Sequence, residues 1–315
     1  MQHILVTGGA GFIGSHLVEA LLELDYKITV IDNFDGFYDR SIKTKNTQSF
    51  RDNANCTFLE ADICDENIYE TLAQNKIDCI VHLAAKAGVR PSIEKPLDYE
   101  HVNIRGTQLL LEFARKKNIK KFVMASSSSV YGINQNFPWS ESDYVLKPIS
   151  PYAATKLSTE FIGSVYSELY DIHFCALRFF TVYGPRQRPD LAIHKFIKKL
   201  LNDEAIDVYG NGDTLRDYTY VDDIVGGVIG AINYNQTKYE IFNLGNSDCI
   251  SLSELLACIE KEFDKKFIIN RMPQQKGDAP KTFADITKAK ELLGYNPQTK
   301  ITEGINKFRT WIINQ

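Results

Sequence analysis

The fold is decided by the stretch His3-Ile4-Leu5-Val6-Thr7-Gly8-Gly9-Ala10-Gly11-Phe12-Ile13-Gly14. Its first five residues predict a buried strand, and an apolar periodicity from Gly11 to Leu24 predicts a helix. Gly8 permits a tight turn, Gly11 lets a pyrophosphate approach the backbone, and Gly14 packs the helix against the strand. The helix N-terminus then faces the phosphates. The stretch therefore predicts a dinucleotide site at Gly8, Gly11, Phe12, Ile13 and Gly14.

Two other interpretations of the glycines are weaker. A tight turn with no ligand would need neither the strand before it nor the acid at the end of the next strand. A phosphate-binding loop of the NTPase type would need Gly-Lys followed by Ser or Thr, which is absent here.

The first half of the chain alternates strands and helices. The expected strands are His3–Thr7, Ile28–Asp32, Cys56–Ala61, Cys79–Leu83, Phe122–Ser126 and Phe174–Phe179. The expected helices are Gly11–Leu24, Leu97–Lys116 and Pro151–Tyr170. Strands that are apolar on both faces fit a parallel sheet covered by helices. We therefore predict an α/β fold with a doubly wound parallel Rossmann sheet.

The rhythm changes after Phe180. Pro185, Pro189, Gly210 and Gly212 separate short elements there, which indicates a smaller α+β domain. We expect residues 1–180, with later returning segments, to form the cofactor domain. Residues 181–315 would mostly form the substrate domain.

Composition excludes several partners. The 315 residues are 44% hydrophobic and carry a net charge of −4, as in an ordinary globular protein that binds neither nucleic acid nor anionic membrane. We expect no transmembrane helix and no signal peptide. The six cysteines show no C-x-x-C spacing and no histidine cluster at metal spacing. We therefore expect free thiols, no metal site and a cytoplasmic location.

Asp32 ends the second expected strand, eighteen residues after Gly14. Its carboxylate would accept hydrogen bonds from the adenosine ribose hydroxyls and repel a 2′-phosphate, so we expect NAD rather than NADP. Asp62, at the end of the third strand, is a candidate for the adenine edge. A solvated strand end would explain Asp62 equally well. The neighbours Asn33 and Ile63 are placed at the same site.

Two further motifs carry acid–base chemistry. Ser126-Ser127-Ser128-Ser129-Val130-Tyr131-Gly132 follows the fifth strand, and Tyr152-Ala153-Ala154-Thr155-Lys156 begins a helix. Tyrosine and lysine four residues apart share one helix face. The ammonium should lower the tyrosine pKa toward neutrality. Such a pair removes a proton from an alcohol while hydride leaves its carbon. By itself the spacing is common, but here it follows a dinucleotide fold.

With these motifs in view, the chain resembles the extended short-chain dehydrogenases/reductases of the nucleotide-sugar epimerase/dehydratase group. The likeness covers essentially the whole length. Beyond the stretches already quoted it includes His82-Leu83-Ala84-Ala85, Arg178-Phe179-Phe180-Thr181-Val182-Tyr183-Gly184-Pro185 and Arg216-Asp217-Tyr218-Thr219-Tyr220-Val221-Asp222-Asp223.

The resemblance implies roles for individual residues. Tyr152 would be the base, Lys156 would hold the nicotinamide ribose, and Ser127 would bind the reacting hydroxyl. The resemblance places Leu83, Ala84, Ala85 and Asn103 at the cofactor. Ser126 is expected to end the strand, and the three serines after it to face the pocket.

The group shares oxidation of a sugar at C4 to a 4-ketone. A dehydratase then needs further carboxylates directly after the catalytic hydroxyl residue, and a decarboxylating relative carries one. Ser128 and Ser129 stand at those positions. The resemblance therefore implies the simplest outcome, in which the ketone turns and takes hydride back on its other face. This is 4-epimerisation without net consumption of NAD.

The sugar is indicated by Thr181, which stands where UDP-glucose 4-epimerases usually carry Asn. The segment Thr181–Asp190 resembles the UDP-glucuronate 4-epimerases instead. Hydroxyls of Ser128, Ser129 and Thr181 would suit a sugar carboxylate, although strand-end and turn chemistry would also explain them. Three alternatives remain: a UDP-glucose or UDP-N-acetylglucosamine 4-epimerase, a UDP-glucuronate decarboxylase, and an NAD-binding protein without catalysis. Tyr152 and Lys156 disfavour the last.

The rest of the substrate site also comes from the resemblance. Arg188 and Arg216 would bind the diphosphate, since arginine suits phosphate. Asp278 would accept the uridine ribose hydroxyls. Gln275 departs from an arginine found in many relatives, and Arg90 or Arg271 would replace it. Tyr209 would lie near uracil.

The resemblance also implies a homodimer, formed through helices 97–116 and 151–170. Apolar residues on two faces of the second helix fit this arrangement, as would burial within one chain. They are Leu157, Phe161, Val165 and Leu169 on one face, with Ile162 and Tyr166 on the other.

Overall fold

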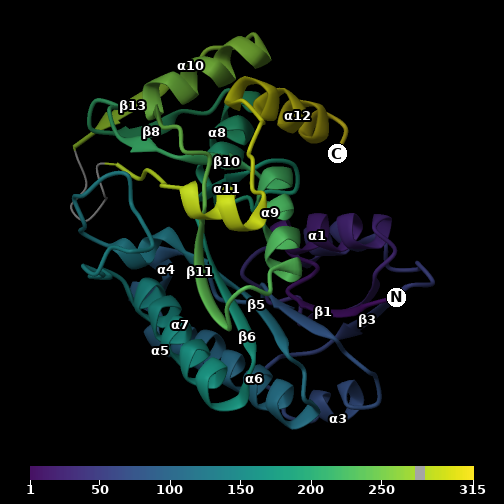
Figure 1. Ribbon diagram of the computed structural model, residues 1–315. Coiled ribbons are helices and arrows are strands. Elements are labelled where there is room, and N and C mark those ends of the chain that lie inside the picture. The colour runs from purple at the N-terminus through teal and green to yellow at the C-terminus, as the bar shows by residue number, and fades with distance from the viewer. Residues whose placement is uncertain (274–280) are drawn as a thin grey trace.

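A seven-stranded parallel sheet forms the centre of the protein, whose computed structural model describes residues 1–273 and 281–315. The strand order is β11-β6-β5-β4-β1-β2-β3 (Figure 1). The strands are β1 (His3–Thr7), β2 (Lys27–Asp32), β3 (Cys56–Glu60), β4 (Cys79–His82), β5 (Lys121–Ser127), β6 (His173–Phe179) and β11 (Tyr239–Leu244). The chain reverses its direction of travel between β1 and β4, which is where such sheets bind ligands. The predicted Rossmann fold is confirmed.

Helices cover both faces of the sheet. One face carries α1 (Phe12–Glu23) and α9 (Val221–Asn233), and the other carries α6 (Gly106–Lys117) and α7 (Pro151–Tyr170). Alternate residues of β1 therefore enter different cores. Ile4 and Val6 pack on one side and Leu5 on the other, and all three are fully buried.

The helical run expected over Leu97–Lys116 is helical in the structure, but it is not one regular α-helix. The chain forms α5 (Pro96–Tyr99), a π-helical turn η1 (Glu100–Arg105) and then α6. The wider turn buries Asn103, whose side chain bonds to Lys86 and Thr155. π-turns arise where a local contact outweighs regular helical bonding. Helical periodicity in the sequence gave no sign of this contact.

Smaller paired strands form the second region, which gathers at one end of the sheet (Figure 1). They are β7 (Thr181–Tyr183) with β10 (Tyr218–Tyr220), β8 (Ile206–Tyr209) with β13 (Ile269–Met272), and β9 (Leu215–Arg216) with β12 (Ile250–Ser251). Helices α8 (Ala192–Leu201), α10 (Leu252–Phe263), α11 (Thr287–Leu293) and α12 (Ile301–Ile313) accompany them. Short helices α2 (Arg40–Thr47), α3 (Ile68–Leu72), α4 (Val89–Glu94) and η2 (Ser128–Tyr131) lie in the sheet connections.

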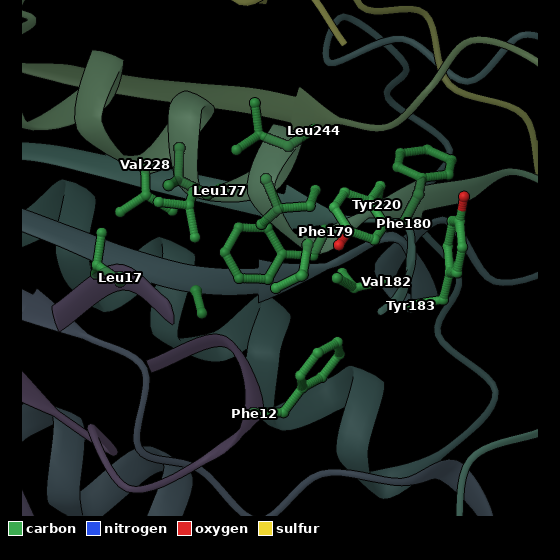
Figure 2. Close-up of a cluster of buried hydrophobic side chains, with 14 of the residues drawn as sticks. Phe12, Leu17, Leu177, Phe179, Phe180, Val182, Tyr183, Tyr220, Val228 and Leu244 are labelled. Carbon is green, nitrogen blue, oxygen red and sulfur yellow. The ribbon is translucent and has the colours of Figure 1, made fainter. Parts of the chain in front are cut away.

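One core joins the two regions. Figure 2 shows Phe12 and Leu17 of α1, Phe179 of β6, Val182 of β7 and Tyr220 of β10 within one buried cluster. The strand β11 comes from residues after 180 yet pairs with β6 along its whole length. The two regions are therefore packed against each other through shared apolar residues.

Two further observations concern the described residues. The six cysteines are free, and Cys79 and Cys175 are buried. No helix within residues 1–273 and 281–315 has the length and apolar character needed to span a bilayer.

Candidate active site

A cavity of about 570 Å³ lies at the carboxyl ends of the sheet strands. Its walls come from both regions of the chain. Asp32 ends β2, and Gly8 and Leu83 directly follow β1 and β4, whereas Thr181 and Arg188 belong to the second region. The cavity therefore begins at the predicted cofactor site and reaches the predicted sugar site.

The glycine turn at the cofactor end has no room for side chains. Gly8 has a φ of +76°, and a Cβ there would lie 2.7 Å from the backbone nitrogen of Ala84. A Cβ on Gly14 would lie 2.1 Å from the carbonyl oxygen of Gly8. Gly11 provides no side-chain cap for α1, and the first turn of α1 holds no acidic residue. Its free N–H end suits a phosphate.

Asp32 lies at the end of the cavity predicted to hold adenosine, and backbone N–H groups hold its side chain in place. Its carboxylate accepts hydrogen bonds from the N–H groups of Ala10 (3.1 Å) and Phe34 (2.8 Å). Asn33 Nδ2 donates to Asp62 Oδ2 at 2.8 Å, so the ends of β2 and β3 are joined. Ile63 also lines the cavity.

Lys43 is a cavity residue that the sequence analysis missed. Its ammonium lies 3.5 Å from Asp32 Oδ1, and its side chain is only 9% exposed. Lys43 belongs to α2, eleven residues after Asp32. No motif spacing marks it, because the contact depends on how α2 packs beside β2.

Asn103 has a different position from the one expected. It does not line the cavity with Leu83, Ala84 and Ala85. Its Oδ1 accepts from the Lys86 N–H at 2.8 Å, and its Nδ2 donates to the Lys86 carbonyl (3.0 Å) and to Thr155 Oγ1 (3.0 Å). Asn103 therefore joins the chain after β4 to α7 from a position outside the cavity lining.

Tyr152 and Lys156 lie in the first turns of α7 because the start of this helix is well defined. Ser150 caps it by accepting from the Ala153 N–H at 3.2 Å, and Pro151 takes the first helical position. Both side chains line the cavity. Lys156 Nζ donates to the Ala125 carbonyl at 2.7 Å, which fixes the ammonium beneath the end of β5.

The expected fall in the Tyr152 pKa is not observed. Burial raises the pKa of Tyr152 above its ordinary value, and the Ser127 hydroxyl and the Arg188 charge oppose this without cancelling it. Burial also lowers the pKa of Lys156 to about 8, opposed by the carboxylate of Glu160. The spacing of Tyr and Lys predicted their proximity but not the desolvation of both groups.

A buried ion pair stands behind Lys156. Arg178 donates to Glu160 through Nε at 3.0 Å and Nη2 at 2.7 Å, and both side chains are at most 2% exposed. Glu160 Oε1 also accepts from Ser126 Oγ. This pair fixes the end of β5 next to Ser127 and places a negative charge one helical turn from Lys156.

Hydroxyl groups line the end of the cavity predicted to hold the sugar. Ser127, Ser129 and Thr181 are among the lining residues together with Tyr152. Ser127 Oγ donates to Ser129 Oγ at 3.1 Å. The expectation for the serine run needs correction, because β5 ends at Ser127, Ser126 also reaches the cavity and Ser128 does not. Ser128 begins the turn η2, which directs it away from the lining.

Arg188 reaches the cavity, whereas Arg216 does not. Arg188 donates to Asp190 at 2.7 Å and to the Ala87 carbonyl at 3.3 Å, and its guanidinium lies 4.8 Å from the centre of the Phe37 ring. Arg216 instead donates to the Leu215 carbonyl at 2.9 Å.

A second hollow adjoins the described ends of β8 and β13. It is lined by Tyr209, Arg271 and the turn Gly210–Thr214. The guanidinium of Arg90 lies 6.0 Å from the centre of the Tyr209 ring. Gln275 and Asp278, assigned to this end of the substrate, lie outside the described residues.

Comparison with known proteins identifies the group. The family described as GDP-mannose 4,6 dehydratase matches residues 5–308. The chain belongs to the extended short-chain dehydrogenases/reductases. It is 38% identical to the UDP-glucuronate 4-epimerase of Thermodesulfobacterium geofontis over 313 residues, which are 99% of this chain and 96% of the relative. The resemblance expected from the motifs is therefore confirmed.

Two solved members of this family have the same fold. The UDP-glucuronic acid 4-epimerase of Bacillus cereus, in complex with UDP-glucuronic acid and NAD, is 38% identical with a TM-score of 0.92, and 99% of each chain is covered. The UDP-glucose 4-epimerase of Thermotoga maritima, with UDP-glucose, is 34% identical with a TM-score of 0.91 and the same coverage.

Proposed function

We propose that the protein is an NAD-dependent nucleotide-sugar 4-epimerase that converts UDP-glucuronate to UDP-galacturonate. The observation that carries this proposal is the set of groups at the sugar end of the cavity. Ser127, Ser129 and Thr181 offer neutral hydroxyls, and Arg188 adds one cation beside Tyr152. Hydroxyl donors suit a carboxylate, which accepts several hydrogen bonds.

The cofactor end fits NAD. Gly8, Gly11 and Gly14 leave space for a pyrophosphate at the N-terminus of α1, and Asp32 offers a carboxylate to the adenosine ribose. When bound, NAD supplies the acceptor and the donor of the hydride exchanged with C4. The Asp32 carboxylate would repel the 2′-phosphate of NADP, whereas the Lys43 ammonium beside it would attract that phosphate. The preference for NAD over NADP therefore depends on which of these two charges dominates.

The protein's own groups handle the proton. Tyr152 accepts the proton of the C4 hydroxyl, and Ser127 holds the same oxygen in a hydrogen bond. Lys156 and Arg188 place positive charge near the Tyr152 phenolate that accepts this proton, so the ketone forms without a carboxylate base. Tyr152 returns the proton after the ketone has turned over. Neither Ser127 nor Ser129 is a base for removing a C5 proton, so dehydration is disfavoured.

The hydroxyl set also explains how carbon dioxide is retained. A 4-keto glucuronate is a β-keto acid, which loses its carboxylate when the C5–carboxyl bond aligns with the ketone. Ser129 and Thr181 would fix the carboxylate in another rotamer. Decarboxylation is therefore a side reaction that this site suppresses.

A UDP-glucose 4-epimerase is the second candidate, favoured by the fold shared with the Thermotoga maritima protein. The two candidates differ in whether the substrate carries a carboxylate at C5.

Incubation with each UDP-sugar and catalytic NAD tests the proposal. With UDP-glucuronate, we expect UDP-galacturonate to appear without net NADH, as separated by anion-exchange chromatography. UDP-glucose and UDP-N-acetylglucosamine should turn over at least about tenfold less efficiently, since lost carboxylate contacts leave buried donors unpaired. Efficient turnover of UDP-glucose alone would favour the second candidate.

We also propose that two copies of the chain associate through α7. Phe161, Val165 and Leu169 are 62%, 51% and 65% exposed along one face of α7, and Leu97 of α5 is 79% exposed. Tyr166, on the opposite face, is buried within the chain. An apolar stripe of this length supports a homodimer.

A further inference from the structure

An ion pair lies across the cofactor end of the cavity and has no part in the chemistry described above. Lys86 Nζ lies 3.0 Å from Asp35 Oδ2, and both residues line the cavity. Asp35 follows β2 and Lys86 follows β4, and these two strands flank β1. The pair therefore bridges the cavity across the carboxyl end of β1, where the Gly8 turn forms another wall.

Hydrogen bonds hold both partners near the ion pair. Lys86 is held through its N–H and its carbonyl by Asn103, at 2.8 Å and 3.0 Å. Asp35 Oδ1 accepts from the Phe37 N–H at 3.1 Å, which leaves Oδ2 for Lys86. Rotation of the long lysine side chain is therefore enough to open the bridge without moving either segment.

The Asp35–Lys86 ion pair is weak enough to break and re-form repeatedly. The Lys86 and Asp35 side chains are 25% and 37% exposed, so water competes for both charges. Burial raises the pKa of Asp35, but the bond and charge of Lys86, the Phe37 N–H and the charge of Lys43 together outweigh burial, and the pKa lies below its ordinary value. The carboxylate is thus charged at neutral pH, and the pair is both present and breakable.

The same segment also reaches the sugar end. Phe37, two residues after Asp35, packs under the Arg188 guanidinium at 4.8 Å from the ring centre. Residues 35–37 therefore run along the cavity from the glycine turn to the substrate residues, and the ion pair joins this segment to the chain after β4.

We propose that the Asp35–Lys86 ion pair is a latch that closes over the diphosphate of bound NAD and slows its release. This inference rests on the proposed use of NAD. A dinucleotide held at the Gly8 turn would share the cavity with the ion pair, so it would leave freely only when the pair opens. Retention suits an enzyme that returns the hydride to its own substrate.

The rate of NADH release tests the latch. Wild type, Asp35→Asn, Lys86→Met and the double variant are loaded with NADH and chased with excess NAD, and the loss of bound NADH fluorescence is followed by stopped flow. We expect each single variant to release NADH about fivefold faster, as a partly exposed ion pair allows. The double variant should release it no faster than either single variant, and added salt should speed only the wild type.

Two variants control for effects on folding. Glu60→Gln breaks the exposed Arg40–Glu60 pair, which lies outside the cavity lining, and should leave release unchanged. The charge exchange Asp35→Lys with Lys86→Asp rebuilds the pair in reverse and should restore slow release.

The outcomes separate the latch from the function on which it rests. Faster release from Lys86→Met together with unchanged or slower release from Asp35→Asn would mean that Lys86 grips the phosphates alone, which overturns the latch. NADH bound normally but released at one rate by all variants overturns it as well and leaves the proposed function standing. Failure of the wild type to bind NAD(H) would contradict both the latch and the proposed function.

Discussion

At the scale of single residues, the reactivity of this site depends on which charges are buried together. Lys156 is enclosed beneath β5, and burial lowers its pKa to about 8, while Glu160 opposes that shift. Glu160 is itself neutralised by two bonds from Arg178. The sequence predicted that Tyr152 and Lys156 would be neighbours, because four residues make one helical turn. It did not predict the role of Glu160, since the partner of this residue, Arg178, comes from β6.

The pH profile should reveal this arrangement. Above pH about 8 Lys156 loses its proton, the phenolate of Tyr152 loses a stabilising charge, and turnover should decline. The double variant Glu160→Gln, Arg178→Gln removes the carboxylate without leaving a buried charge unpaired. Its Lys156 pKa should fall further, so the decline should begin at lower pH. Ser126→Ala, which removes a hydrogen bond but no charge, is the control. An unchanged alkaline limb in the double variant would contradict this role.

The hydroxyls at the sugar end make separate predictions. Ser129→Ala and Thr181→Ala should each raise the share of UDP-pentose formed from UDP-glucuronate several-fold, because the carboxylate loses a donor and its rotamer is freed. Ser128→Ala is the matched control, since Ser128 lies outside the cavity lining and should keep the wild-type ratio. Product ratios by mass spectrometry decide the matter. An increase in Ser128→Ala alone would refute the assignment.

At the scale of elements, the bounds of a helix were predicted correctly where residues in the sequence mark both its start and its end. The structure has α7 at Pro151–Tyr170, the predicted bounds, because Ser150 and Pro151 start it and Asp171 ends it in a left-handed conformation. The helical run expected over 97–116 contains a π-helical turn that was not predicted, in which Asn103 contacts Lys86 and Thr155. The position of Lys43 in the cavity and the Asp35–Lys86 ion pair were also not predicted from the sequence. Each contact is made between elements that meet only in the folded sheet.

Two helical glycines test how closely the elements pack. A Cβ on Gly163 of α7 would lie 2.2 Å from the Phe174 ring of β6, so Gly163→Ala should destabilise the protein by about 1–3 kcal/mol. Gly226 of α9 is exposed with no atom within 4 Å, and Gly226→Ala should stabilise it by up to about 1 kcal/mol. Midpoints of thermal unfolding should move in opposite directions. A shift of both in one direction would contradict the packing described for α7.

At the scale of the whole molecule, one cavity joins two regions that are interleaved in the sequence. The strand β11 returns to the sheet from beyond residue 180, and its place at the sheet edge follows from pairing with β6, which no local pattern specifies. The doubly wound parallel sheet was predictable because alternating strands and helices allow few topologies. The assembly of Tyr152, Thr181 and Arg188 around one cavity follows from that order.

The outer face of α7 should govern assembly. The 35.8 kDa chain should elute with twice that mass in light scattering, and Val165→Glu should shift it toward the monomer, because a buried charge without a partner is costly. Ile313→Glu on α12, at a position 57% exposed, is the control and should remain dimeric. A monomeric wild type would rule out this interface.

The central claim is that hydride leaves C4 and returns to the same carbon within one site. It is tested most directly with UDP-glucuronate deuterated at C4, and the product is analysed by mass spectrometry and NMR. We expect UDP-galacturonate that keeps the deuterium at C4, with no net NADH and no exchange at C5. Deuterium lost to solvent, or a UDP-pentose as the main product, would contradict the account.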